Sequence, residues 1–310
     1  MRIAVTGAAG FVGGAIVEQA VTSGLKVRAI VRDTHPAGHA DEYVACGDLL
    51  TADPVPLVHG CEAVIHCAAR VHRTRREDRA AGVSSYKSMN VDLPVRLAKA
   101  ARAHGVRNFV QISSVAALAS STPVGMVYGD HTQPRPATPY GKSKLAADEA
   151  LLALATNEFV VTCLRPPAVI GPGVGAWFAL LLKAAARGLP LPLGSIDNRR
   201  NFIAVENLAD AALTAATAET SGAFIVTDSQ PVSTGELYRR LLKGFGFRDR
   251  VWNWPAAPVR LAAAAALGRR SESLLGNAAF DGTRFAHQFD WSPPVAFERS
   301  LEGTIAGSRC

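Results

Sequence analysis

The first 165 residues alternate between short apolar segments and longer segments with helical periodicity, and this alternation restricts the chain to few folds. The apolar segments are rich in β-branched residues and apolar on both faces, which is typical of buried parallel strands. Strands are predicted at residues 2–6, 27–31, 43–46, 63–67, 108–113 and 159–164. Helical patterns cover residues 13–23, 90–104 and 139–155. This repetition predicts a doubly wound α/β fold, whose parallel sheet binds ligands at the carboxyl ends of its strands.

After residue 166 the pattern changes, because proline and glycine become frequent up to residue 194. One more strand is predicted at residues 223–227, and helical patterns resume at residues 176–187, 205–217, 234–245, 258–267 and 295–306. We interpret residues 1–166 as the main sheet domain and residues 167–310 mainly as a smaller lobe laid over the sheet edge. Residues 201–228 are candidates for a return to the main sheet.

The composition is that of a chain able to bury a large core. Of the 310 residues, 48% are hydrophobic and 19% are charged, which excludes wholesale disorder. The five cysteines contain no C-x-x-C pair, which excludes a disulfide scaffold and a cysteine zinc site, so we expect no metal centre. This cysteine usage suits a reducing compartment. Because the chain opens directly on a strand, without a signal peptide, we expect a cytoplasmic protein.

Membrane spans and nucleic-acid partners are not expected. No uncharged apolar run reaches the roughly 18–20 residues that a membrane-spanning helix needs. The longest weakly polar run, residues 261–268, is short and Ala-rich, and we predict that it forms a packed helix. The net charge is +7 and arginines cluster between residues 70 and 79, but Glu77 and Asp78 interrupt them and no aromatic residue is interleaved to stack bases. This cluster predicts a solvated loop, with some arginines facing an anionic small molecule.

A glycine motif connects the first predicted strand to the first predicted helix. Gly7, Gly10 and Gly13 have the spacing G-x-x-G-x-x-G. Gly7 permits a tight turn, Gly10 lets backbone N–H groups approach a pyrophosphate, and Gly13 lets the helix pack closely on the strand. The helix N-terminus adds positive potential. The motif predicts a dinucleotide-binding site that includes Phe11 and Val12, which open the helix; a purely structural turn is the alternative.

The end of the second strand bears on the choice of dinucleotide. NAD sites usually place an acidic residue there to bind the ribose 2′-hydroxyl, but this strand ends Val31-Arg32-Asp33. Arg32 can pair with a 2′-phosphate, which slightly favours NADP(H) over NAD(H). The alternative is that Arg32 faces solvent and Asp33 binds the 2′-hydroxyl. After the third strand, Asp48 is a candidate acceptor for the adenine amino group, next to Leu49; an ordinary turn aspartate is equally compatible.

The strongest group of candidate catalytic residues follows the fifth strand. Ser114 comes directly after that strand, and Tyr140 and Lys144 are spaced i, i+4, which places them on one face of the next helix. A phenol with a pKa of about 10 is a poor base at neutral pH, and a nearby ammonium lowers that pKa. Ser114 is positioned to hydrogen-bond the same substrate oxygen. The trio predicts proton transfer to or from a substrate whose hydride the cofactor exchanges; an ordinary exposed Tyr–Lys pair is the alternative.

These motifs together resemble the extended short-chain dehydrogenases/reductases that act on nucleotide sugars as 4-epimerases, dehydratases and reductases, over nearly the whole chain. The resemblance implies a Rossmann-type sheet with a smaller substrate-binding lobe. It implies that Cys67, Ala68 and Ala69 line the cofactor. It also implies that residues 164–173, which include Pro167, close over the nicotinamide.

The resemblance also implies where a nucleotide-sugar substrate binds. Residues 200–205 resemble the family segment whose arginine contacts the nucleotide diphosphate, which assigns that role to Arg200; capping of a surface loop is the alternative. Arg70 lies in residues 68–72, a stretch similar to bacterial UDP-N-acetylhexosamine 4-epimerases and UDP-4-keto-6-deoxy-sugar reductases of polysaccharide synthesis. Trp177 stands where the family usually has an asparagine that reaches the diphosphate. A second arginine expected near residues 272–274 is missing.

The resemblance leaves several functions open. An NADPH-dependent reductase of a UDP-4-keto-6-deoxy-(N-acetyl)hexose is favoured, because Arg32 follows the strand where an acid would indicate NAD. A UDP-sugar 4-epimerase with bound NAD would use the same catalytic trio. A dehydratase is disfavoured, because Val115 and Ala116 replace the acidic pair usual after the catalytic serine or threonine. A non-catalytic dinucleotide sensor is disfavoured by retention of the trio. A homodimer through the helices at residues 90–104 and 139–155 is implied.

Overall fold

A computed structural model describes residues 1–33, 40–71, 85–228, 230–268 and 270–308. Two sequence predictions fall partly outside this range. His72, at the end of the stretch beginning with Ala68, and the arginines between residues 73 and 79 lie outside the described residues.

The centre of the molecule is a seven-stranded sheet, formed among the described residues with the order β3-β2-β1-β4-β5-β6-β9. Every pair of neighbouring strands is parallel, so the predicted parallel sheet is confirmed. The strands are β1 (Arg2–Thr6), β2 (Lys26–Val31), β3 (Glu42–Ala45), β4 (Ala63–His66), β5 (Asn108–Ile112), β6 (Val160–Arg165) and β9 (Gly222–Ile225). The chain order reverses between β1 and β4, and ligands bind beside such a switch point in open parallel sheets.

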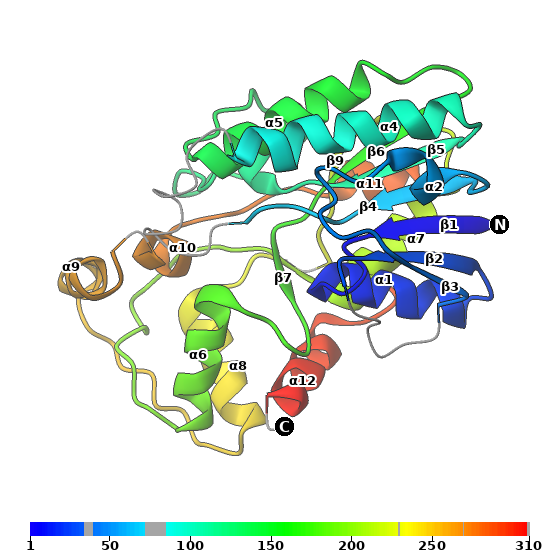
Figure 1. Cartoon of the computed structure of the whole chain (residues 1–310). Helices are drawn as coiled ribbons and strands as arrows, with labels where there is room; N and C mark the ends of the chain where they lie inside the picture. Colours follow the sequence, from blue (N-terminus) through cyan, green and yellow to red (C-terminus); the bar gives the residue numbers. More distant parts are fainter. Residues whose placement is uncertain (34–39, 72–84, 229, 269, 309–310) are drawn as a thin grey trace.

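Helices cover both faces of this sheet (Figure 1). In β1, Ile3 and Val5 enter one core with Ile16 and Leu208, whereas Ala4 enters the other core. Because successive residues of a strand point to opposite faces, both faces of β1 are buried and its sequence is apolar throughout. One face carries α1 (Phe11–Thr22), α7 (Val205–Ala215) and α11 (Thr283–Gln288); the other carries α2 (Pro54–Val58), α4 (Leu93–Ala103) and α5 (Pro139–Leu152).

A third hydrophobic core lies beside the carboxyl edge of the sheet, at the lower left of Figure 1. It packs α6 (Ala176–Ala186), α8 (Thr234–Gly244) and α12 (Phe297–Gly307) around Phe202 and Tyr238. A small parallel pair, β7 (Ala168–Ile170) and β8 (Phe202–Ala204), joins this core to the main sheet. The chain then returns to the main sheet, because α7 packs against α1 and β9 pairs with β6.

The helix predicted at residues 258–267 is present as α9 (Ala256–Leu267), but the prediction that it is packed is wrong. Val259 is the one residue of α9 that is buried, while Leu261 is 73% exposed. The neighbouring short helix α10 (Arg270–Leu275) contacts α9 on one side. The local sequence is enough to predict that this helix forms, but the lobe contacts only a narrow side of it. In the described part of the chain, no helix has the length and apolar character needed to cross a membrane.

Candidate functional site

The glycine motif forms a tight loop between β1 and α1. Gly7 has a φ of +67°, a conformation that favours glycine. A Cβ on Gly13 would overlap the Gly7 carbonyl oxygen and lie 2.8 Å from the Gly7 carbonyl carbon, so only glycine lets α1 approach the loop this closely. Gly10 is the N-cap of α1 and supplies no side-chain hydrogen bond to the first turn, which also lacks acidic residues. The N–H groups of the first turn and the positive end of the helix are therefore available to an anion, and the loop fits a dinucleotide pyrophosphate.

Other predicted cofactor residues lie directly against this loop. A Cβ on Gly7 would be 2.9 Å from the Ala68 nitrogen, and Cys67 N donates to the Thr6 carbonyl at 3.2 Å. On the opposite side, the Phe11 ring would be 3.3 Å from a Cβ on Gly171. Segments that precede and follow residue 166 thus meet at the glycine loop.

The end of β2 lies next to the loop that follows β3, because Gly47 N donates to the Arg32 carbonyl at 3.0 Å. Val31 is buried, whereas Arg32 and Asp33 are both exposed. Asp48 Oδ1 accepts a hydrogen bond from Leu50 N at 3.0 Å, which is the geometry of a turn aspartate. Both of the candidate side chains for the ribose, Arg32 and Asp33, therefore stand at the surface of this strand end.

Ser114 and Tyr140 meet because α5 packs closely on the turn after β5. Ser114 caps the short helix η2 (Val115–Ala117), and its Oγ accepts from Ala116 N at 3.1 Å. A Cβ on Gly141 would overlap the Ala116 carbonyl oxygen, so the glycine after Tyr140 is what lets the two elements touch. The Tyr140 hydroxyl shares a side-chain hydrogen bond with Ser114. Thr138 caps α5 by accepting from Gly141 N at 3.0 Å, which fixes where the helix begins.

The pKa values of Tyr140 and Lys144 are set mainly by burial. Burial raises the pKa of Tyr140 to about 12; the hydrogen bond with Ser114 acts against this and the Asp148 charge adds to it. Lys144 Nζ donates to the Ile112 carbonyl at 2.8 Å, and the expectation that its charge lowers the pKa of Tyr140 stays a prediction. Burial lowers the pKa of Lys144 itself to about 8, although the Asp148 carboxylate opposes this. At neutral pH Tyr140 is therefore a protonated phenol, the state in which it donates a proton.

Three residues, Asn90, Asp148 and Arg165, support the site, and the sequence did not predict this role for them. Asn90 lies in a π-helical turn, η1 (Ser88–Asp92); its Nδ2 donates to Ser143 Oγ at 2.9 Å, and its Oδ1 accepts from Arg70 N at 2.7 Å. It thereby ties the segment after β4 to the catalytic face of α5. Asp148 is fully buried and forms an ion pair with Arg165 at 2.8 Å. The i, i+4 spacing of Asp148 from Lys144 is the sequence pattern that could have predicted its role. The π-helical turn that holds Asn90 leaves no comparable pattern in the sequence.

In the lobe, the structure brings together two of the predicted substrate residues. The Arg200 guanidinium lies over the Trp177 ring, 5.4 Å from its centroid, and Arg200 Nη1 donates to the Gly276 carbonyl at 2.7 Å. Arg200 is 7% exposed and its Nε has no hydrogen-bond partner. Burial lowers its pKa to about 10, which still leaves it charged at neutral pH. A buried, charged donor without a partner is costly unless a ligand satisfies it, so Arg200 fits an anionic group.

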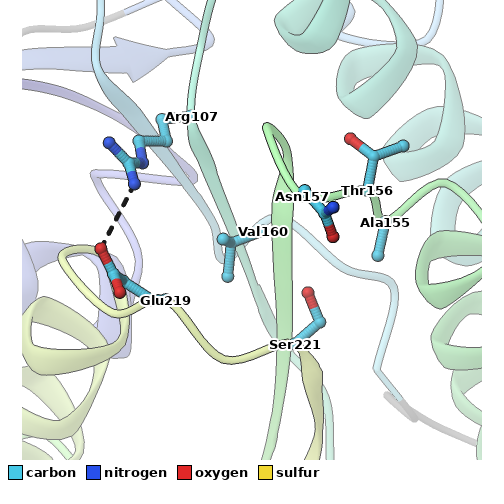
Figure 2. A pocket seen from close by; sticks show the side chains of 7 residues that line it. All are labelled: Arg107, Ala155, Thr156, Asn157, Val160, Glu219 and Ser221. Atoms are coloured by element: carbon cyan, nitrogen blue, oxygen red, sulfur yellow. Dashed lines mark hydrogen bonds and ion pairs between the residues drawn. The ribbon is translucent and has the colours of Figure 1, made fainter.

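A separate hollow of about 470 Å³ lies at the opposite edge of the sheet (Figure 2). It is bordered by Arg107 and Val160, at the amino ends of β5 and β6, and by Glu219, which pairs with Arg107 at 3.3 Å. Parallel sheets bind their ligands at the carboxyl ends of the strands, where the glycine loop, Ser114 and Tyr140 lie. We therefore assign the functional site to that edge. No group of three metal-ligating side chains that could hold an ion occurs among the described residues.

Comparison with known proteins identifies the class to which this fold and site belong. Residues 3–226 match the NAD dependent epimerase/dehydratase family, and the chain belongs to that family. It is therefore an enzyme built for a nicotinamide dinucleotide, which agrees with the fit of the glycine loop.

Individual relatives extend the match to almost the full chain. The chain is similar to a UDP-glucose 4-epimerase of Vibrio cholerae, with 31% identity over 97% of this chain and 94% of that protein. It is 28% identical to a UDP-glucose 4-epimerase of Mycolicibacterium smegmatis over 98% of this chain and 97% of that protein. Among solved structures, MoeE5 in complex with UDP-glucose and NAD superposes with a TM-score of 0.79 and 25% identity, covering 100% of this chain and 99% of that one.

Proposed function

We propose that this protein catalyses hydride transfer at C4 of a UDP-linked hexose. The observation that carries the proposal is the Tyr140–Ser114 hydrogen bond at the carboxyl edge of β5, with Lys144 buried behind it and the glycine loop beside the neighbouring strand β4. The named relatives act on UDP-glucose at C4, and MoeE5 binds UDP-glucose together with NAD, which supports the substrate class.

In the proposed mechanism, Tyr140 moves a proton at the C4 oxygen of the sugar. The nicotinamide, when bound, supplies or accepts the C4 hydride. Ser114 shares a hydrogen bond with the Tyr140 hydroxyl, and in this mechanism it orients the same C4 oxygen. Lys144 is held by the Ile112 carbonyl, and its charge favours the phenolate form when Tyr140 has given up its proton. Asn90 and Gly141 act on position only, because they fix α5 against the turns that carry the other groups.

Two forms of this chemistry fit the site, and different observations favour each. A reductase takes its hydride from the reduced cofactor and its proton from Tyr140, and the exposed Arg32 after a strand without a terminal acid favours NADPH. A 4-epimerase begins by removing the C4 hydroxyl proton and keeps its NAD bound, and the UDP-glucose 4-epimerase relatives favour this form. We rank the NADPH-dependent reductase of a UDP-4-keto sugar first on the residues alone.

The test of the proposal is Tyr140→Phe, assayed with UDP-sugars and both nicotinamide cofactors. Loss of general acid–base catalysis is expected to slow turnover by roughly 10²–10⁴-fold. Cofactor affinity is expected to stay close to that of the wild type, because the ring remains. Tyr128→Phe is the matched control, and its rate is expected to be unchanged. Turnover of Tyr140→Phe at the wild-type rate would show that another group moves the proton.

The choice between reductase and epimerase follows from the cofactor. The purified protein is titrated with NADPH and NADH, and any dinucleotide that co-purifies is identified. Tighter NADPH binding, with the difference lost in Arg32→Ala and kept in the control Asp33→Ala, supports the reductase. A contact of this kind changes affinity by roughly ten- to a hundredfold. Co-purified NAD, with interconversion of the two C4 epimers and no net oxidation, supports the epimerase and removes the role of Arg32.

We also propose that Arg200 binds the substrate diphosphate, with Trp177 holding its guanidinium in place. Arg200→Ala is expected to weaken UDP binding by roughly 1.5–3 kcal/mol and to leave cofactor binding unchanged. Arg199→Ala is the matched control, because Arg199 is exposed and pairs with Asp197. Equal UDP affinity in both variants would remove Arg200 from the site. From the family resemblance we further propose a homodimer through α4 and α5, which the mass of the protein in solution tests.

A further inference from the structure

The most unusual surface of the molecule lies at α9 and the loop before it. Trp252, Trp254 and Leu261 are 55%, 57% and 73% exposed. Ala257, Ala264 and Ala265 are also exposed, and with Leu261 they follow i, i+4, i+7 and i+8 spacing, which places them on one side of the helix. We call these six residues the α9 surface. An exposed apolar side of this kind is typical of a surface that interacts with a partner or a membrane.

The opposite side of the helix is already used by the lobe. Val259 is buried in the lobe core, and Ala263 packs against the same core. Arg260 Nη1 donates to the Leu275 carbonyl at 2.9 Å, which fixes the rotation of α9 about its axis. Figure 1 shows α9 as an outlying element of the lobe, at the far left of the view. The exposure of the α9 surface therefore follows from how the helix is anchored.

The charges around this surface have one sign. Among the described residues, α9 and the loop before it (residues 250–267) carry two charged side chains, Arg250 and Arg260, and no acidic one. The flanking Asp249 is already paired with Arg239 at 3.0 Å. The whole chain carries a net charge of +7. The charge next to the α9 surface is therefore positive, which favours an anionic partner.

We propose that the α9 surface docks on an anionic lipid bilayer and holds the enzyme at a membrane surface. Tryptophan side chains favour the interface between headgroups and acyl chains, and arginines attract anionic headgroups. The exposed side of α9 is built mainly from alanine, whose small side chain offers few projections to a matching protein surface, whereas a fluid bilayer requires no shape complementarity. The helix lies on the bilayer and does not cross it.

The experiment measures binding of the full chain to lipid vesicles by co-sedimentation. The wild type is expected to bind vesicles of phosphatidylcholine with phosphatidylglycerol, and to bind vesicles of pure phosphatidylcholine much less. Higher salt is expected to release it, because the headgroup attraction is screened. The triple variant Trp252→Ser/Trp254→Ser/Leu261→Ser is expected to bind about tenfold less or weaker still, because binding scales with the apolar area inserted. The matched control is Leu50→Ser, an exposed leucine near β3.

Two readouts make the result decisive. All substituted side chains are exposed, so the urea midpoints of the variants are expected to match that of the wild type. Tryptophan fluorescence is expected to shift to the blue with anionic vesicles in the wild type and not in the triple variant. The proposal is overturned if the wild type ignores anionic vesicles, if the triple variant binds as well as the wild type, or if the substitutions change only the oligomeric mass. None of these results depends on the proposed sugar chemistry.

Discussion

Replacing Gly13 by alanine tests how the glycine loop is built. The added Cβ would overlap the Gly7 carbonyl oxygen and lie 2.8 Å from the Gly7 carbonyl carbon and 3.1 Å from the Ala8 Cα. Carbon atoms in good contact are about 3.5–4.0 Å apart. All three neighbours are main-chain atoms, which cannot rotate aside, so α1 must move away from β1. Overpacking of this kind costs roughly 1–3 kcal/mol, and the displaced helix N-terminus no longer meets the pyrophosphate.

Gly14→Ala is the matched control in the next position of the same helix. Its Cβ would meet the Ala8 carbonyl oxygen at 3.5 Å, an ordinary contact. Alanine is favoured over glycine inside a helix by roughly 1 kcal/mol, and this gain cancels because both glycines lie inside α1. The two variants are therefore expected to differ by about 1–3 kcal/mol in unfolding free energy, the cost of the overpacking at Gly13. Urea denaturation measures this difference, and calorimetric titration with NADPH and NADH measures cofactor affinity. Equal stability and equal affinity in the two variants would refute the close-approach argument.

Two further predictions concern the buried charges behind the site. Folding lowers the pKa of Lys144 from 10.5 to about 8, so its burial costs stability in full below pH 8, and stability recovers as the pH rises from about 8 towards 10.5. Lys144→Met is therefore expected to raise the unfolding free energy at pH 7 by up to about 3 kcal/mol and to abolish activity. Lys142 is exposed, so Lys142→Met is the control whose stability is expected to stay unchanged. A Lys144→Met variant less stable than the wild type would contradict this reasoning. Arg165→Met leaves the buried Asp148 carboxylate without its partner and is expected to cost about 3–5 kcal/mol at pH 7.5. Burial already raises the pKa of Asp148, so this loss is expected to shrink as the carboxyl group becomes protonated at lower pH. The double variant Asp148→Leu/Arg165→Met is expected to recover most of the lost stability. Urea denaturation of the single and double variants at pH 7.5 and at a lower pH measures these differences.

Local sequence patterns were enough to predict the parallel sheet, the glycine loop and the relative placement of Tyr140 and Lys144. The strand–helix alternation gave the parallel sheet, because apolar segments buried on both faces have few other solutions. The glycine spacing gave a loop with a positive φ at Gly7, and the i, i+4 spacing put Tyr140 and Lys144 on one side of α5. Each of these features depends on residues within about one or two turns of chain, which is the range over which periodicity acts.

The tertiary structure decided what depends on distant neighbours. The pKa of Tyr140 rises because the surrounding fold buries it, which the i, i+4 spacing does not encode. Arg200 owes its orientation to Gly276, which is 76 residues away. The α9 helix formed where its sequence predicts, yet it lies at the surface because the lobe contacts it only along the side that carries Val259. Burial, charge pairing and exposure are properties of the assembled cores, and a sequence pattern shows which side of an element is apolar but not what lies against it.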